Sequence, residues 1–241
     1  MATILITGGA GGIGREVARQ LAGRGDATVL ADVDLARAEA VAAEIDGASA
    51  VQLDVTDPAA CTRAVAEVVE RHGQIDGAVC CAGLFHYESA DEMRPEHLDL
   101  MLRVNVQGTF FSAQAVACEM LAAGSRGAIV LFSSGAALRA VGAPAYSASK
   151  GAVEALVREL SLAWAERGIR VNGIAPGVIL TDMSLEARSD PETIEAFMRH
   201  TPLKRMGEPE EVAAAAVFLL SDAASYISGT VLPTDGGFLS V

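Results

Sequence analysis

The chain has 241 residues, of which 51% are hydrophobic and 20% are charged, enough apolar material for the core of one α/β domain and too much for a disordered chain. Its net charge of −13 disfavours nucleic acid, which needs a basic stripe, and anionic membrane surfaces. No apolar run reaches the length of about 18 residues typical of a membrane span, and the start "MATILITGG" lacks the cationic segment and cleavage site of a signal peptide. We therefore expect a cytoplasmic protein whose partner is a small molecule.

Short apolar runs alternate with helical patterns along the chain. Strands are predicted at 3–7, 27–32, 49–55, 75–83, 127–134, 169–177 and 229–237, and helices at 12–25, 35–45, 58–72, 95–123, 144–168 and 208–222. Strands separated by helices indicate βαβ crossovers, so the predicted fold class is α/β: a single doubly wound, Rossmann-type domain over residues 1–241, with a parallel seven-stranded sheet and helices on both faces. Ligands of such sheets bind beyond the carboxyl ends of the strands.

The exit of the first strand carries the glycine-rich run "TGGAGGIG", from Thr7 to Gly14. It follows a strand and opens a helix, which is the context in which a G-x-G-x-x-G match indicates a dinucleotide site. Glycines let the backbone approach a pyrophosphate, and the helix N-terminus offers N–H groups and a positive dipole end. The alternative is a glycine-rich turn without a ligand, and the context favours the nucleotide.

Asp32 ends the second predicted strand roughly 20 residues after these glycines, where an acid can accept a hydrogen bond from the adenosine ribose 2′-OH. A 2′-phosphate there would meet a like charge, and no Lys or Arg lies between Gly8 and Gly14 to offset it. The predicted cofactor is therefore NAD, in preference to NADP. The alternative role for Asp32 is to cap the next helix, which Asp34 could do as well.

The stretch "YSASK" places Tyr146 and Lys150 four residues apart, on one face of a predicted helix. A phenol with its ordinary pKa of about 10 is a poor base at neutral pH. A nearby ammonium group stabilises the phenolate and is expected to lower that pKa, which gives a group that can exchange a proton with an alcohol. The preceding strand ends in "SSG", whose hydroxyls can donate to a substrate oxygen. For Y-x-x-x-K taken alone, a surface helix pair is the alternative.

Together these motifs resemble the classical short-chain dehydrogenase/reductase (SDR) family over essentially the whole chain. The resemblance rests on "TGGAGGIG", Asp32, "LDV", "CCAG", "NVQG", "SS", "YSASK", "APG" and the C-terminal run from "PLKRMGEPEEV" to "TDGG", in that order. It implies an oxidoreductase that interconverts a secondary alcohol and a ketone by hydride transfer, with Tyr146 as the acid/base and, given Asp32, with NAD as the cofactor. Family members are commonly tetramers, so we expect a homotetramer.

The resemblance also implies roles for individual residues. Lys150 would lower the pKa of Tyr146 and hold the nicotinamide ribose, Ser134 would orient the substrate oxygen, and Asn105 would help to hold a relay water. The cofactor would be bound at the strand exits, by Gly8, Gly11, Gly12, Ile13, Gly14, Asp32, Asp54, Val55, Cys81, Ala82, Gly83, Ile179 and Thr181, together with Tyr146 and Lys150. No metal ligand is implied, and His86 has no evident partner at ligand spacing.

Two positions depart from the family pattern. The usual spacing, counted back from Tyr146, reaches Ser133, whereas alignment from the strand start "GAIVLFSS" reaches Ser134. We choose Ser134, because strand register fixes the face that a side chain takes, while loops absorb deletions. The family motif Asn-Asn-Ala-Gly is Cys-Cys-Ala-Gly here, so Cys81 replaces an asparagine that ties strands together. A disulfide between Cys80 and Cys81 would be strained, and we expect both sulfur atoms to pack in the interior.

Residues 182–201 follow the cofactor loop, where the family keeps a mobile substrate lid. Met183, Leu185, Phe197 and Met198 either face an apolar ligand there or pack the lid on the body. Two alternatives to the predicted activity remain. A 3-oxoacyl-[acyl-carrier-protein] reductase-like enzyme is favoured by the C-terminal motif and opposed by Asp32. A catalytically inactive nucleotide-sensing protein of the same fold is opposed by the retained catalytic motifs.

Overall fold

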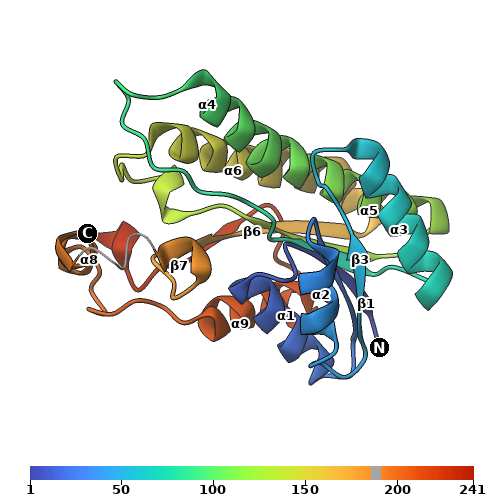
Figure 1. The fold of residues 1–241 in the computed structure, drawn as a ribbon. Coiled ribbons are helices and arrows are strands. Elements are labelled where there is room, and N and C mark those ends of the chain that lie inside the picture. The colour runs from blue at the N-terminus through green and yellow to red at the C-terminus, as the bar shows by residue number, and fades with distance from the viewer. Residues whose placement is uncertain (186–190) are drawn as a thin grey trace.

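Seven strands form one sheet in the computed structural model, which describes residues 1–185 and 191–241 (Figure 1). The strands are β1 (Thr3–Thr7), β2 (Ala27–Asp32), β3 (Ala48–Gln52), β4 (Gly77–Cys80), β5 (Gly127–Phe132), β6 (Ile169–Pro176) and β7 (Val231–Thr234). Their order is β3-β2-β1-β4-β5-β6-β7, and every neighbouring pair is parallel. The predicted seven-stranded parallel sheet is confirmed. The strand order reverses between β1 and β4, which is where doubly wound sheets bind ligands.

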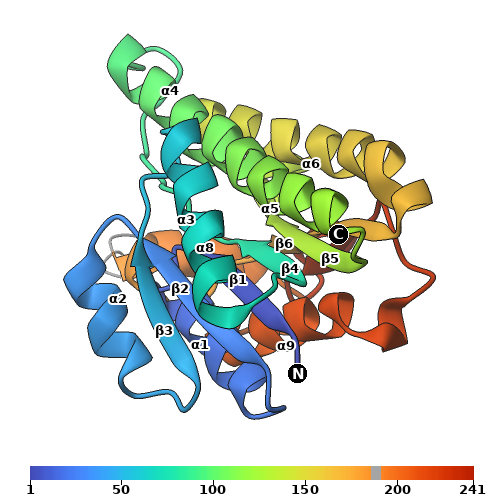
Figure 2. The same ribbon diagram turned by 90° about the vertical axis from the view of Figure 1, so that its right-hand side faces the viewer.

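Helices cover both faces of the sheet (Figures 1 and 2). One face carries α1 (Gly12–Ala22), α2 (Leu35–Ala42) and α9 (Pro209–Leu220), and the other carries α3 (Pro58–His72), α4 (Pro95–Leu102), α5 (Thr109–Ala123) and α6 (Pro144–Trp164). The helix α8 (Pro191–Arg199) lies next to the C-terminal segment, where the rings of Phe197 and Phe238 are 6.4 Å apart. The doubly wound arrangement is therefore confirmed as well.

Successive residues of the central strands point to opposite faces of the sheet, so each face has a hydrophobic core of its own. In β1, Leu5 belongs to the core under α3, α5 and α6, while Ile4 and Ile6 belong to the core under α1, α2 and α9. In β5, Leu131 and Phe132 divide in the same way. Because successive strand residues point to opposite faces, a strand that is covered on both faces must be apolar throughout. This accounts for the continuous apolar runs from which the strands were predicted.

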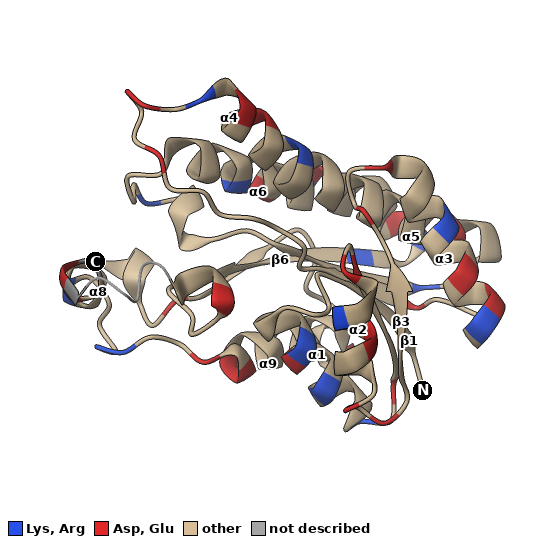
Figure 3. Cartoon of the chain, in the orientation of Figure 1, with Lys and Arg blue, Asp and Glu red and all other residues tan. Residues whose placement is uncertain are grey.

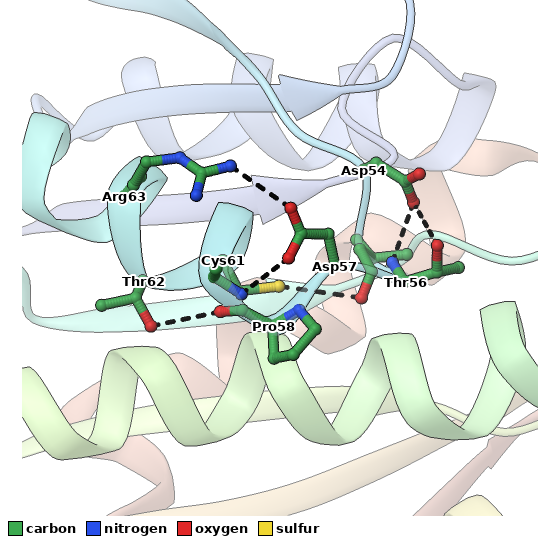
Figure 4. Close-up of polar contacts among 9 residues, drawn as sticks. Asp54, Thr56, Asp57, Pro58, Cys61, Thr62 and Arg63 are labelled. Atoms are coloured by element: carbon green, nitrogen blue, oxygen red, sulfur yellow. Dashed lines mark hydrogen bonds and ion pairs between the residues drawn. The ribbon is translucent and has the colours of Figure 1, made fainter.

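Helix boundaries follow local capping chemistry, as α3 illustrates (Figure 4). Asp57 precedes the helix and accepts a hydrogen bond from the Ala59 N–H at 2.8 Å, and Pro58 occupies the first turn. Gly73 ends the helix in the left-handed conformation at φ = 81°, which a residue without a Cβ adopts at little cost. The prediction of a helix over 58–72 is confirmed to the residue.

Three elements differ from the prediction. The long helix over 95–123 is continuous, but its middle, Arg103–Gly108, has π-helical geometry between α4 and α5. Strands β3 and β4 stop several residues short of the predicted ends, because their last residues turn into the loops that line the cleft. The sequence pattern did not predict α8, a short helix in the less periodic stretch after residue 181.

No helix among the described residues is long and apolar enough to cross a membrane. In Figure 3, segments coloured for acidic and for basic residues alternate on α1 and α3, whereas α9 carries acidic residues only, near its start. The acidic residues, 31 against 18 Lys and Arg in the whole chain, are distributed over several elements in this view.

Candidate active site

The glycine run lies at the point where β1 meets α1, with the backbone packed tightly against its neighbours. A Cβ on Gly8, which has φ = 65°, would lie 2.9 Å from the Ala82 backbone, and one on Gly14 would lie 2.4 Å from the carbonyl oxygen of Gly8. Gly11 precedes the first turn of α1, which contains Gly12, Ile13 and Gly14. The N–H groups of a first helical turn have no intrahelical acceptor, so this turn offers donors to an anion. The cradle fits a dinucleotide diphosphate.

Asp32 lies at the carboxyl end of β2, beside this turn. Its carboxylate accepts hydrogen bonds from the backbone N–H groups of Ala10 and Asp34, both at 3.2 Å. The capping of α2 falls to Asp34, whose side chain accepts from the Arg37 N–H at 3.1 Å. Asp32 is therefore held over the glycine turn rather than used as the helix cap, in a position suited to the ribose of an adenosine group.

The next strand exits extend the cleft along the sheet edge. Asp54 follows β3 and accepts hydrogen bonds from the N–H and hydroxyl of Thr56, at 2.9 and 2.7 Å (Figure 4). Val55 is buried and contacts the position where Gly108 would carry a Cβ. At the exit of β4, the Ala82 N–H donates to the Thr7 hydroxyl at 3.2 Å, which ties the loop to β1. The contact between this loop and β1 therefore uses the backbone N–H of Ala82 and does not need the side chain of Cys81.

The adjacent cysteines lie on opposite sides of the sheet. Cys80 belongs to the core under α3, α5 and α6, whereas Cys81 packs against the core under α1, α2 and α9. Burial raises the pKa of both thiols, that of Cys81 to about 12. Both are therefore neutral thiols at physiological pH, in agreement with a packing role and against redox chemistry.

Lys150 reaches from α6 into the centre of the cleft. It is 5% exposed, and its ammonium donates to the Phe132 carbonyl at the end of β5, at 2.9 Å. A Cβ on Gly83 would lie 3.4 Å from the same nitrogen, so the exit of β4 leaves it room. The ring of Tyr146, one turn earlier on α6, has its centroid 5.7 Å from this nitrogen. The fold thus places phenol and ammonium together at the carboxyl ends of β4 and β5.

Loss of water around these two groups shifts both pKa values away from the charged forms. Burial lowers the pKa of Lys150 to about 8. Burial also raises the pKa of Tyr146, although a hydrogen bond with the Ser134 hydroxyl opposes the shift. The expected lowering of the tyrosine pKa is therefore absent in the protein by itself, because desolvation outweighs the other influences on the phenol.

The two serines after β5 point to different partners. Ser133 is buried, and its hydroxyl lies 3.2 Å from both the Lys150 carbonyl oxygen and a Glu154 carboxylate oxygen on α6. Ser134 is the serine that hydrogen-bonds Tyr146, and its oxygen also accepts from the Ala136 N–H at 3.2 Å. Of the two serines, Ser134 is thus the one that contacts Tyr146, and its role as the catalytic serine stays a prediction.

Asn105 lies in the π-helical segment and is completely buried. Its side-chain amide accepts from the Leu84 N–H at 2.8 Å and donates to the Leu84 carbonyl at 2.9 Å, and it also donates to the Ser149 hydroxyl at 3.0 Å. π-Helical turns often occur at functional sites. Here the turn brings Asn105 to the loop after β4 and to α6. Ser149 was not singled out from the sequence, although it lies within "YSASK".

The loop after β6 closes the cleft from the other side. Thr181 contacts the position where Gly12 would carry a Cβ, so this loop lies against the first turn of α1. Ile179 is buried beside a cavity of about 480 Å³ that Met198 also lines. Of the predicted lid residues, Phe197 packs on Phe238, while Met183 and Leu185 are about half exposed. Residues 186–190 of that predicted lid lie outside the described residues.

Two further residues organise the loops on the substrate side. The ring of Phe85 contacts that of Tyr146 edge-on, with centroids 4.9 Å apart. Arg139 donates to the Phe238 carbonyl at 2.7 Å and lies over its ring, which anchors the loop after Ser134 to the C-terminal segment. No sequence signal would have paired residues so far apart.

Comparison with known proteins gives consistent matches. A family model described as enoyl-(acyl carrier protein) reductase matches residues 8–239. Galactitol 2-dehydrogenase (L-tagatose-forming) of Cereibacter sphaeroides is 40% identical over 97% of this chain and 93% of its own, and D-threitol dehydrogenase of Mycolicibacterium smegmatis is 39% identical over 97% and 91%. The structure of a gluconate 5-dehydrogenase from Burkholderia cenocepacia in complex with NADP and tartrate has a TM-score of 0.95 at 34% identity, over 100% of this chain and 96% of its own.

Proposed function

The chain belongs to the short-chain dehydrogenase/reductase family and is an oxidoreductase acting on CH–OH groups, and from this premise we propose that it is an NAD-dependent dehydrogenase of a small polyol or sugar acid. It would interconvert a secondary alcohol and its ketone. The observation that carries the proposal is the convergence of Ser134, Tyr146 and Lys150 at the strand exits beside the glycine cradle. The substrate class follows the names of the relatives, which act on polyols.

Each residue of this group has a distinct task in the proposed reaction. Tyr146 takes the proton from the substrate hydroxyl, or returns it to the forming alcohol. Ser134 donates a hydrogen bond to the same substrate oxygen and keeps it within reach of the phenol. Lys150 supplies a positive charge that favours the phenolate. Asn105 holds the loop after β4 against α6 and would help to hold a relay water next to Lys150.

The dinucleotide, when bound, supplies the hydride acceptor or donor. Gly8, Gly11, Gly12, Ile13 and Gly14 would receive its diphosphate on backbone N–H groups, and Asp32 would accept from the adenosine ribose. The remaining cofactor contacts that we propose are Asp54, Val55, Cys81, Ala82, Gly83, Ile179 and Thr181. The close backbone approach at Gly8 and Gly14 supports this assignment.

Preference for NAD over NADP rests on Asp32. A carboxylate at the ribose would repel a 2′-phosphate. The gluconate 5-dehydrogenase relative was crystallised with NADP, while another relative, 37% identical, is an NAD-dependent glycerol dehydrogenase, so the family does not decide the matter. We expect Asp32→Ser to move the ratio of kcat/KM for NAD and NADP by about tenfold towards NADP, which corresponds to about 1.4 kcal/mol. An unchanged ratio would contradict the ribose assignment.

A substrate panel tests the activity itself. The purified protein is incubated with NAD or NADP and with galactitol, threitol, sorbitol, gluconate, glycerol and simple secondary alcohols, and the absorbance of the reduced nicotinamide is followed. We expect turnover with at least one polyol or sugar acid. Turnover only with 3-oxoacyl thioesters and NADPH would favour the carrier-protein reductase. Dinucleotide binding without turnover would favour a catalytically inactive, nucleotide-sensing protein of the same fold. One 40% identical relative is named as an inactive 2-(S)-hydroxypropyl-CoM dehydrogenase.

A further inference from the structure

We propose that His86, Glu88 and His97 form a binding site for one zinc ion at the outer rim of the substrate side. His86 and Glu88 belong to the loop between β4 and α4, and His97 lies in the first turns of α4. The site would not take part in hydride transfer, and it does not depend on the proposed activity.

Three different metal-binding side chains meet at this place. One ligand atom from each residue lies within 4.8 Å of the other two. The His97 Nδ1 is 2.7 Å from a Glu88 carboxylate oxygen, and the rings of His86 and His97 pack edge-on with centroids 4.0 Å apart. Zinc bonds of about 2.0–2.1 Å in a tetrahedron place ligand atoms about 3.3 Å apart. The donors therefore need only small side-chain movements, and the exposed His86 is free to make the largest.

The guanidinium group of Arg94 already contacts two of the three residues. The Arg94 Nε donates to the Glu88 Oε1 at 2.8 Å, and the Arg94 Nη2 lies 3.0 Å from the His97 Nδ1. Two of the three proposed ligand residues thus already lie against a positive charge, which the Glu88 carboxylate binds. The Arg94 side chain is 61% exposed and can turn into solvent when an ion replaces it. Arg94 must therefore compete with the metal ion, so removal of the arginine is expected to strengthen metal binding.

The donor set indicates the class of ion. Two imidazoles and one carboxylate are typical of zinc and of other borderline first-row cations, whereas magnesium and calcium prefer oxygen ligands. Three protein ligands leave a fourth position for water. An ion bound here would join the loop after β4 to α4. That loop also carries Phe85, whose ring lies against Tyr146, so the ion would stiffen one wall of the reaction centre without touching it.

The spacing of these three residues in the sequence does not reveal that they lie together. Glu88 is only two residues from His86, but His97 is eleven residues away and comes into reach through the turn that precedes α4. The carboxylate also accepts from the Arg94 backbone N–H at 3.1 Å, which fixes that turn. The spacing matches no familiar zinc motif, so the prediction from sequence left His86 without a partner.

Calorimetric titration with Zn²⁺ tests the site. All measurements use untagged, chelator-treated protein carrying Cys118→Ser, which removes an exposed thiol as a competing ligand. The parent protein is expected to bind one equivalent of Zn²⁺. His86→Ala and His97→Ala should each weaken binding at least tenfold, while Arg94→Gln should strengthen it severalfold. His72→Ala, which removes a histidine on α3 far from the cluster, is the matched control and should leave binding unchanged.

Each result decides for or against the site. Absence of stoichiometric binding, or binding that survives both histidine substitutions, would overturn the proposal. Weaker binding in Arg94→Gln would overturn it as well, because the cluster would then be an ion-pair network that needs its arginine. Circular dichroism of every variant checks folding. Co²⁺ in place of Zn²⁺ is expected to give a strong visible absorption band in a near-tetrahedral site, whereas octahedral Co²⁺ absorbs only weakly.

Discussion

The cofactor side and the substrate side of the cleft are built in different ways. On the cofactor side, backbone meets backbone: Gly8 against Ala82, and Gly14 against Gly8, at separations that allow no side chain. On the substrate side, loops meet through side chains from distant parts of the chain, as Phe85 does with Tyr146. The first construction serves a dinucleotide that is common to many enzymes. The second is made by loops, which tolerate change, and can therefore be adapted to a particular substrate.

This difference makes a testable division. Changes at the catalytic centre should affect every substrate alike, changes on the cofactor side should affect dinucleotide binding, and neither should alter the order in which substrates are preferred. A substitution at the catalytic centre or on the cofactor side that changes the order of substrate preference would contradict this division.

The largest effect is expected for Tyr146→Phe. The substitution removes the phenol hydroxyl, which is the group that can exchange a proton, and keeps the ring that contacts Phe85. We expect kcat to fall about 10³-fold with every substrate, within the range for general acid–base catalysis. The dissociation constant of NADH, measured by fluorescence, should stay within about twofold of the parent. A variant that keeps its full rate would show that another group moves the proton.

The adjacent serines provide a matched pair for the second prediction. Ser134→Ala removes the hydroxyl that bonds to Tyr146, and we expect kcat to fall about 10²-fold. Ser133→Ala should change kcat only a few-fold, but it leaves the buried Glu154 without that donor and should lower the free energy of unfolding by about 1–3 kcal/mol. Steady-state kinetics and urea unfolding of both variants separate the two roles. Interchanged results would assign catalysis to Ser133.

The same contrast explains how much the sequence could predict. The parallel sheet, the order of its elements and the glycine cradle follow from apolar runs and motif context, because they depend on local backbone chemistry. The partner of Ser133 did not follow, since register places Glu154 beneath it only after α6 packs on β5. The tyrosine pKa was expected to fall, yet burial raises it, and burial is a property of the assembled fold. Contacts such as that of Arg139 with Phe238 join residues about 100 positions apart.

Lys150 allows a test of the catalytic centre without any substrate, because burial of its ammonium group should lower the free energy of unfolding of the protein by itself. Burial lowers its pKa from 10.5 to about 8, so below pH 8 both folded and unfolded chains carry the proton and the folded protein bears the cost of burying it. Between about pH 8 and 10.5 the unfolded chain binds more protons, so this contribution to stability rises with pH.

Replacement by a neutral residue should therefore stabilise the protein, although it removes the charge that the proposed reaction uses. For Lys150→Met at pH 7, a gain of about 3 kcal/mol from the removed charge, less about 1 kcal/mol for the lost hydrogen bond to Phe132, leaves about 2 kcal/mol. The gain should shrink as the pH approaches 10.5. Denaturant unfolding of both proteins at several pH values measures it. A destabilised variant at pH 7 would mean that the ammonium is better solvated than its burial indicates.

The smallest effect concerns an ion pair that joins the two sides. The Arg37 Nη2 on α2 lies 2.6 Å from the Asp182 Oδ2, just after Thr181, so the pair spans the cleft between the ribose end and the substrate end. The two side chains are 51% and 70% exposed, and such pairs contribute about 0.5 kcal/mol, or roughly twofold in an equilibrium constant. We expect Arg37→Gln and Asp182→Asn each to speed NADH dissociation about twofold.

A double-mutant cycle decides whether the pair acts as a clasp over the cofactor. If it does, the double variant should release NADH no faster than either single variant, and the difference from the parent should vanish near 1 M salt, where the screening length is about 3 Å. Arg63→Gln, which breaks a comparably exposed pair with Asp57 at the start of α3, controls for the loss of one surface charge. Additive effects of the two substitutions would mean that the sides of the cleft are energetically independent. Coupling would mean that a substrate-side segment helps to retain the dinucleotide, and the division between the two sides would then hold for their construction but not for their energetics.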